Sequence, residues 1–293
     1  MSAAESILRR PAVRRAAAGA AMLAAWAAAP ASAPAQVFDK LLEAGEKAAE
    51  VAGKAGAVLP IGAEEETAIG RGVAATLAGY YTLDRDSALT AYVNLVGLAV
   101  AASDPRPDVR YRFGVLGTDQ VNAMATPGGY VFVTRGALAL MESEAELAGV
   151  LAHEVGHVNE KHVVEEIQDR ARTELGTELA GKALNADPEA LDKVVGLGTN
   201  VLFLGLSRED ELEADSLGVV YASRAGYDPA GLGAFVRKLE ANESRPLLKQ
   251  LGATHPKPAD RLKLIDRVAG KAAGGPAAPV LAERFRASVP ASR

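Results

Sequence analysis

The stretch that decides the fold is SEAELAGVLAHEVGH, residues 143–157. Ser143 and Glu146 have the spacing of a capping box, which satisfies free N–H groups at the start of a helix. Apolar residues then recur every three or four positions, which is typical of a helix that packs against a core. The sequence therefore predicts a helix that begins near Ser143 and continues through His157.

This helix carries the pattern H-E-x-x-H at residues 153–157. Residues four apart share one helix face, so His153 and His157 should converge, with Glu154 at the same rim. Two histidines and a carboxylate in this spacing are typical of a zinc site with a general base. The plainer alternative, two surface histidines beside a charged turn, is disfavoured by the apolar residues around the motif. His162 follows too far along a continuous helix to face the metal, so we expect it to be structural.

A catalytic zinc ion needs a third protein ligand and one open position for water. The best candidate lies in SREDELEAD, residues 207–215, on a second predicted helix. Glu211 would be the ligand, and Asp215, one turn later on the same face, would orient a ligand histidine. The other carboxylates of this stretch leave open a merely solvated helix face, since spacing alone does not choose among them.

The surroundings of these motifs predict the fold class. Residues 67–102 have apolar helical spacing and indicate one or two core helices. Period-two alternation then predicts three short strands, at residues 109–115, 121–125 and 130–134. The tight turn at residues 126–129 favours antiparallel pairing. Since residues 143–268 read as helices, we expect an α+β, mostly helical fold with a small antiparallel sheet.

Composition excludes several other functions. The 293 residues are 49% hydrophobic and 24% charged, which is ordinary for a globular protein. There are 32 Lys and Arg against 37 Asp and Glu, so a nucleic-acid partner is not expected. Cysteine is absent, which excludes disulfides, thiolate metal sites and cysteine nucleophiles. A transition-metal site must therefore use histidine and carboxylate.

The N-terminal residues 1–35 are typical of a signal peptide. Four arginines precede a short alanine-rich apolar run, and Ala33-Pro34-Ala35 offers a cleavage site. The run is shorter than the roughly 20 residues of a membrane span, so we favour cleavage over a retained anchor. An ordinary secretory signal is the default, and the paired arginines also permit twin-arginine export. We therefore expect a periplasmic or otherwise exported protein without an integral membrane domain, with peripheral envelope association left open.

The remaining boundaries follow from composition and periodicity. Residues 36–63 are predicted to be an N-terminal helical segment and residues 64–268 the principal domain. Residues 269–293 are rich in Ala, Gly and Pro at their start and are predicted to be a low-complexity tail.

The three segments H-E-x-x-H, S-R-x-x-E-x-E-A-D and T-H-P-x-x-x-x-R, in this order, resemble metallopeptidase family forty-eight. That family includes HtpX-, BepA- and Oma-type proteases and the CAAX prenyl proteases. The resemblance covers roughly residues 64–268 and implies a zincin-like domain with one Zn²⁺ per chain. It also implies that Glu211 is the third ligand beside His153 and His157, and that Asp215 pairs with a ligand histidine.

The resemblance extends to two further segments. Asn122, Ala123, Met124 and Ala125 match the edge strand that lines the cleft in the family, to which a substrate backbone could add as an extra strand. His255, held in a loop by the following proline, corresponds to a histidine that approaches the metal. Its implied role is a removable fourth ligand or, beside Arg261, a transition-state donor. A merely structural His255 is the alternative.

The predicted activity is zinc-dependent hydrolysis of peptide bonds in unfolded or misassembled polypeptides, as part of envelope protein quality control. Glu154 would take a proton from the zinc-bound water and return it to the leaving amine. A rival from another class is a zinc-stabilised periplasmic chaperone or binding module with little proteolysis. A helical structural protein without metal would require three separate motif coincidences.

Overall fold

The computed structural model describes residues 61–104, 106–175, 187–242, 246–248, 255, 258–272 and 279–290. The predicted signal peptide and nearly all of the predicted N-terminal segment lie outside these residues. The described elements belong to one compact unit that starts at Ala55. The domain boundaries proposed from the sequence therefore remain predictions.

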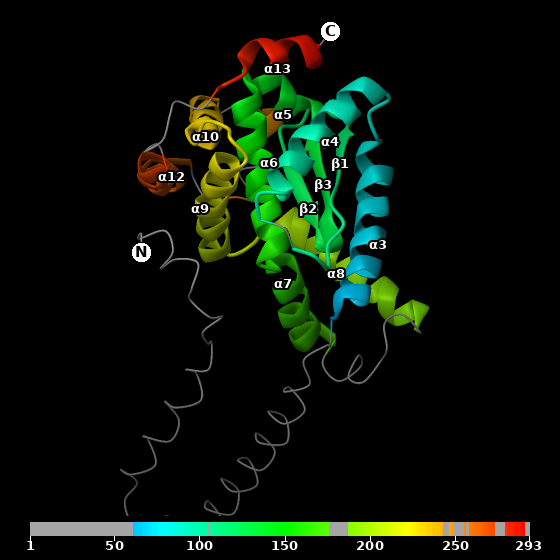
Figure 1. Ribbon diagram of the computed structural model, residues 1–293. Coiled ribbons are helices and arrows are strands. Elements are labelled where there is room, and N and C mark those ends of the chain that lie inside the picture. Colours follow the sequence, from blue (N-terminus) through cyan, green and yellow to red (C-terminus); the bar gives the residue numbers. More distant parts are fainter. Residues whose placement is uncertain are drawn as a thin grey trace, which may run out of the picture. The chain divides into compact units, whose positions relative to one another are not determined.

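A small sheet lies at the centre of the described residues, with helices on both faces (Figure 1). Its strands are β1 (Arg112–Leu116), β2 (Ala123–Thr126) and β3 (Tyr130–Thr134), in the order β1-β3-β2. β2 and β3 are antiparallel, as the turn predicted, whereas β1 runs parallel to β3. The sheet is therefore mixed, which corrects the expectation of a wholly antiparallel one, and the α+β, mostly helical class is confirmed.

The hairpin between β2 and β3 depends on Pro127-Gly128-Gly129, a single 3₁₀ turn (η2). Both glycines have positive φ, +70° and +90°, a conformation that strains residues with a side chain. The Gly128 amide donates to the buried carboxylate of Glu66, 3.1 Å away, which ties the turn to the preceding helix.

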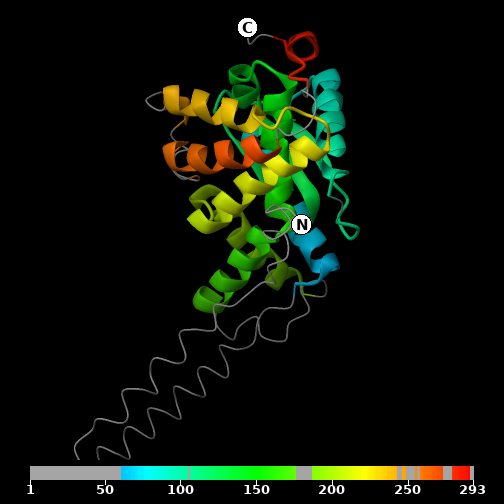
Figure 2. The same ribbon diagram turned by 60° about the vertical axis from the view of Figure 1, so that its left-hand side comes forward.

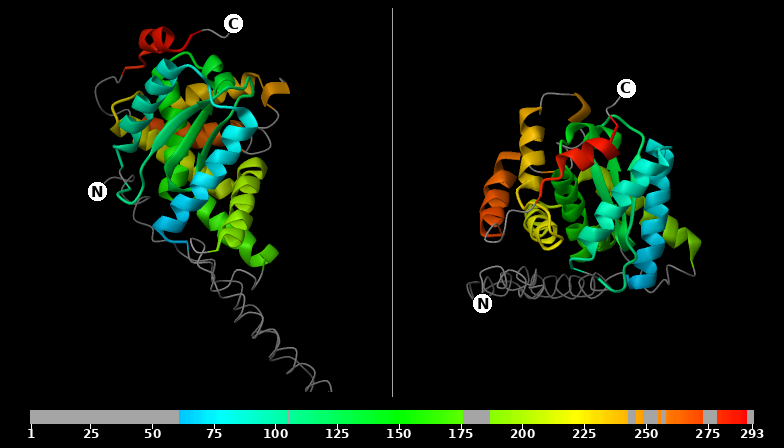
Figure 3. Two further views of the ribbon diagram at one scale, coloured as in Figure 1. Left: turned by 90° about the vertical axis from the view of Figure 1, so that its right-hand side faces the viewer. Right: turned by 45° about the horizontal axis from the view of Figure 1, so that its top comes forward.

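Helices α3 (Ala63–Tyr81) and α8 (Pro188–Leu204) cover one face of the sheet and lie side by side (Figure 3). Met124 and Phe132 point from the strands into this layer, which also includes α7 (His162–Arg170). α7 continues into one π-helical turn, Ala171–Leu175. The neighbouring strand residues point to the opposite face, as the two-residue period of a strand requires.

The opposite face packs against α4 (Ser87–Ala101) and α6 (Glu144–Asn159). Further helices pack beyond α6, as Figure 2 shows. They are α9 (Arg208–Arg224), α10 (Gly231–Ala241) and α12 (Pro258–Ala272). The shorter elements are α5 (Arg135–Leu140) and the 3₁₀ turn η5 (Pro246–Leu248). Within the described residues no single helix has the length and apolar composition to cross a membrane; only the bent pair α8 and α9 meets these criteria jointly.

The segment predicted as a low-complexity tail contains a short helix, α13 (Ala282–Ser288). Phe285 of this helix is buried against the core, and α13 contacts both α4 and α6. The Arg284 guanidinium binds the buried carboxylate of Glu144 at the start of α6. The C-terminal segment is thus attached to the same helix that carries the H-E-x-x-H motif.

Candidate metal centre

Helix α6 buries the whole H-E-x-x-H motif. Ser143 caps the helix, with its hydroxyl accepting from the Glu146 amide at 3.2 Å, as the capping-box spacing predicted. His153, Glu154 and His157 are each at most 4% exposed. The Nε2 atoms of the two histidines lie 3.1 Å apart, so both rings point to one place.

Helix α9 brings a carboxylate to that place. Glu211, only 1% exposed, has Oε1 at 3.5 Å from His157 Nε2 and Oε2 at 3.7 Å from His153 Nε2. Ligand atoms around a tetrahedral zinc ion with bonds of 2.0–2.2 Å are roughly 3.3 Å apart. The two imidazole nitrogens and the Glu211 carboxylate therefore fit Zn²⁺ in number, chemistry and approximate spacing.

The two ligand-bearing helices are held close together by small residues. A Cβ atom at Gly218 of α9 would lie 3.0 Å from the backbone nitrogen of His153, closer than ordinary van der Waals contact. Gly156 of α6 faces Ala214 in the same interface. The spacing of the candidate ligands thus follows from backbone contact between α6 and α9.

Asp215 lies behind His153. Its Oδ1 is 3.1 Å from His153 Nδ1, an ion-pair contact rather than an aligned hydrogen bond. Arg261 of α12 donates to both oxygens of Asp215, Nε at 2.9 Å and Nη2 at 2.7 Å. This arrangement orients the carboxylate toward the histidine, so Arg261 acts on His153 through Asp215.

His255 closes the site from a further direction. Its Nδ1 lies 2.5 Å from Glu211 Oε2, and the donor atoms of His153, Glu211 and His255 all lie within 4.8 Å of one another. These three residues form one close set of donors, and His157 Nε2 lies beside His153 and Glu211. Withdrawal of His255 would leave the donors of His153, His157 and Glu211.

Burial and neighbouring charges shift the pKa values of these groups in different directions. Burial raises the pKa of Glu154, which favours its protonated form. Burial lowers the pKa of His157 and favours the neutral ring, which has one unprotonated nitrogen available for a cation. Burial would raise the pKa of Glu211, but the adjacent imidazoles, His255 first, outweigh it and keep this carboxyl ionised.

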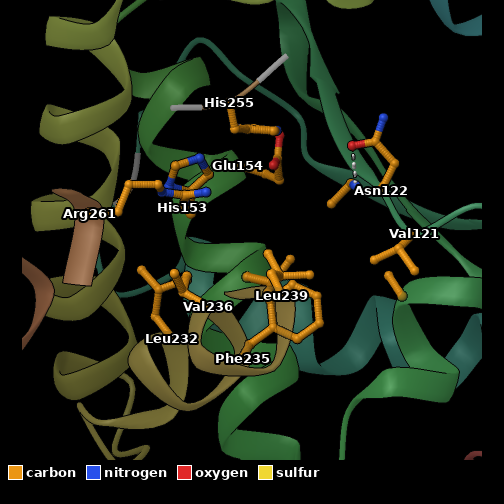
Figure 4. A pocket seen from close by; sticks show the side chains of 13 residues that line it. Val121, Asn122, His153, Glu154, Leu232, Phe235, Val236, Leu239, His255 and Arg261 are labelled. Atoms are coloured by element: carbon orange, nitrogen blue, oxygen red, sulfur yellow. Dashed lines mark hydrogen bonds between the residues drawn. The ribbon is translucent and has the colours of Figure 1, made fainter. Parts of the chain in front are cut away.

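Strand β2 forms a wall of the site. Two cavities adjoin the motif. Four residues line both of them: Asn122, Ala123, Glu154 and His255. The first cavity is closed by apolar side chains of α10, which lie opposite His153 and Glu154 in Figure 4: Leu232, Phe235, Val236 and Leu239. The second is lined by Met124, Ala125 and apolar side chains of α7 and α8.

The predicted edge strand includes β2, one of the two outer strands of the described sheet, and its residues are buried. Asn122, Ala123, Met124 and Ala125 are each at most 8% exposed. The amide of Val121, just before the strand, donates to the carbonyl of Leu247 at 3.0 Å. An extended peptide that paired as far as Val121 would therefore have to displace Leu247 from this amide.

His162 lies closer to the site than its sequence spacing indicated. α6 ends at Asn159, Lys161 adopts a left-handed conformation (φ 61°), and a new helix starts at His162. His162 Nδ1 then lies 3.0 Å from His157 Nδ1. The expectation that His162 turns away assumed a continuous helix. A lysine at position 161 does not predict such a break, because residues in the left-handed conformation are usually Gly, Asn or Asp.

Comparisons with known proteins agree with the geometry. The sequence model of Peptidase family M48 matches residues 87–269, more than half of the chain. The beta-barrel assembly-enhancing proteases of Escherichia coli K12 and Yersinia pestis are 29% and 31% identical, over 78% and 76% of this chain. These alignments cover 48% and 47% of the relatives, so the chain spans about half their length. The mitochondrial metalloendopeptidase OMA1 of Schizosaccharomyces pombe is 31% identical over 60% of this chain and 52% of its own. The chain belongs to peptidase family M48.

Proposed function

We propose that this protein is a zinc-dependent endopeptidase. The observation that carries the proposal is the convergence of His153, His157 and Glu211 donor atoms beside the buried carboxylate of Glu154. The two histidines and Glu211 would hold one Zn²⁺ per chain. Bound zinc supplies a Lewis acid that polarises the scissile carbonyl and lowers the pKa of water toward about 7.

The protein groups would divide the rest of the chemistry among them. Glu154 takes a proton from the attacking water and returns it to the leaving amine, and its raised pKa suits both steps. Asp215, held by Arg261, keeps His153 oriented with Nε2 toward the metal. Asn122, Ala123, Met124 and Ala125 would pair with the substrate backbone once their edge is uncovered.

His255 would act as a removable fourth ligand in this scheme. Its contact with Glu211, and the short distance of its donor atom from those of His153 and Glu211, support a resting state in which His255 would occupy the position that water needs. The alternative is that His255 and Arg261 together donate to the transition state. The structure favours this role less, because Arg261 already donates to both carboxylate oxygens of Asp215.

The proposed substrates are unfolded or misassembled polypeptides of the cell envelope, where a cleaved signal peptide would deliver the protein. Backbone pairing at an edge strand reads little side-chain identity, which suits such substrates. The names of the bacterial relatives, which refer to beta-barrel assembly, favour the same setting.

A second candidate function is a zinc-stabilised periplasmic chaperone that binds unfolded chains and cleaves them poorly. The same observations support it, because His255 at the site and the burial of residues 122–125 would both reduce the rate of cleavage. The test is metal content by mass spectrometry for wild type and Glu211→Ala, with casein cleavage measured with and without a zinc chelator.

One zinc per wild-type chain, lost in Glu211→Ala, with chelator-sensitive cleavage is the expected result. If wild type binds zinc but does not cleave casein, His255→Ala is measured next. Cleavage by this variant would show that His255 blocks the site in wild type. If His255→Ala remains inactive but still prevents aggregation of an unfolded protein, the chaperone is correct. Wild-type protein that binds no zinc overturns both.

A further inference from the structure

Each of the two candidate ligand histidines has a partner on the ring nitrogen that faces away from the site. For His153 this partner is Asp215, as the sequence led us to expect. For His157 it is His162, whose Nδ1 lies 3.0 Å from His157 Nδ1. Both rings of this second pair are buried, at 3% and 4% exposure.

The pairing fixes where the ring protons must be when a cation is bound. A cation on His157 Nε2 takes the lone pair there, so the single proton of the neutral ring is on Nδ1. His157 Nδ1–H then donates to His162 Nδ1, which must be unprotonated to accept. The proton of a neutral His162 is consequently on Nε2, which lies 3.5 Å from Glu213 Oε2.

We propose that His162 is a positioning residue for the metal centre: it accepts the Nδ1–H of His157 and, with Glu213, forms a second orienting relay opposite that of Asp215 and Arg261. This inference rests on the proposed function, since it presumes that His157 binds the metal. Partners of this kind fix the tautomer and orientation of a ligand ring and raise its basicity.

The chain geometry and the local charge support the relay. The left-handed turn at Lys161 is what returns His162 to His157, and L-residues adopt it only at some energetic cost. Glu160, Glu165 and Glu213 all interact electrostatically with the His162 ring. Their negative charge favours the positive polarisation that a bound cation induces in the two imidazoles.

The relay is tested with His162→Leu, His162→Asn and a control, Ile167→Ala. Leucine removes the acceptor, whereas the side-chain oxygen of asparagine occupies a position similar to Nδ1 and can still accept. Ile167 is fully buried on the same helix and is not among the groups around the metal, so Ile167→Ala measures loss of packing alone.

The first readout is zinc affinity, measured by competition with a chromophoric chelator, with thermal unfolding of the metal-free proteins recorded in parallel. His162→Leu should bind zinc roughly 10- to 100-fold more weakly. His162→Asn should recover most of this loss, and Ile167→Ala should unfold at lower temperature with unchanged affinity.

The second readout is nitrogen-15 NMR of histidine-labelled, zinc-loaded protein. The Nδ1 proton of His157 should exchange slowly with water in wild type and shift in His162→Asn. Equal zinc affinity in wild type and His162→Leu, or a loss that His162→Asn does not recover, overturns the relay while leaving the protease proposal intact. If His162→Leu does not fold, His162→Asn and the NMR signal decide alone. Wild-type protein without zinc affinity contradicts the proposed function itself.

Discussion

The two ends of helix α6 both bury polar side chains, but they do so in opposite ways. At the N-terminal end, Glu144 is 0% exposed and accepts hydrogen bonds from Tyr92, Tyr227 and Arg284. Toward the C-terminal end, the Nε2 atoms of His153 and His157 meet each other and the carboxylate of Glu211.

The difference separates a structural cluster from a ligand site. Around Glu144 every acceptor has a donor, which is what a stable buried charge requires. Around His153, two imidazole nitrogens and the Glu211 carboxylate turn toward one another, an arrangement that a bound cation would stabilise. We therefore assign the Glu144 cluster to stability and the His153 cluster to the proposed chemistry.

The difference between the two clusters is tested most directly by the same substitution, Glu to Gln, in each of them. Glu154→Gln should lower kcat by roughly 10²- to 10⁴-fold and retain zinc, because the general base is lost while the ligands remain. Glu144→Gln should lose stability instead and retain turnover at temperatures where it is folded. Peptide-cleavage kinetics, metal content and thermal unfolding of both variants check this. Wild-type turnover by Glu154→Gln would remove Glu154 from the mechanism.

The stability of the Glu144 cluster should depend on pH with a defined sign. Burial raises the pKa of Glu144, but hydrogen bonds from Arg284, Tyr92 and Tyr227 outweigh this and lower it. Since the folded-state pKa lies below the unfolded value, the stabilisation is complete above about pH 4.5 and is lost as pH falls through the folded pKa.

Arg284→Met should cost about 1–3 kcal/mol at neutral pH, toward the low end because the wild-type arginine is itself 56% exposed. The pKa of Glu144 should rise in this variant, so the penalty relative to wild type should shrink as pH falls. Urea unfolding of both proteins between pH 3 and 8 measures the difference. Parallel pH curves for the two proteins would show that Arg284 does not control the ionisation of Glu144.

A smaller effect is expected in cleavage preference. Withdrawal of His255 should open the small apolar cavity between Glu154 and α10 to a substrate side chain next to the scissile bond. Leu239→Asp should reduce kcat/KM for peptides with leucine at that position by roughly tenfold, since one such pocket contact contributes about 1–3 kcal/mol. A peptide library cleaved by wild type and by the variant would show this change. If wild type is inactive because of His255, both proteins are compared in a His255→Ala background. An unchanged preference would place the substrate elsewhere.

The sequence was most informative where local rules and tertiary structure agree. The cap at Ser143, the apolar spacing of α6 and the two hairpin strands were predicted because each depends on neighbouring residues. The parallel position of β1 was not, since it depends on a crossover that no local pattern encodes. Glu211 was the best candidate from the sequence, but helix spacing left its acidic neighbours open and the family resemblance decided among them.

His162 and α13 were missed for different physical reasons. The contact of His162 depends on the backbone conformation of Lys161, which side-chain type does not specify. Residues 282–288 have little helical signal of their own and are stabilised by burial of Phe285 and by the Arg284–Glu144 pair.

The close approach of α6 and α9 at Gly218 also bears on which ion the protein accepts. His153 and His157 belong to one helix and Glu211 to the other, so the gap between the helices sets the radius of the space that the ligands enclose. Metal–ligand distances are specific to about 0.2 Å, and calcium needs bonds several tenths of an ångström longer than zinc. A glycine with no metal-binding atom would thereby help to set the size of the proposed centre, in addition to the preference that its histidine ligands give it for zinc.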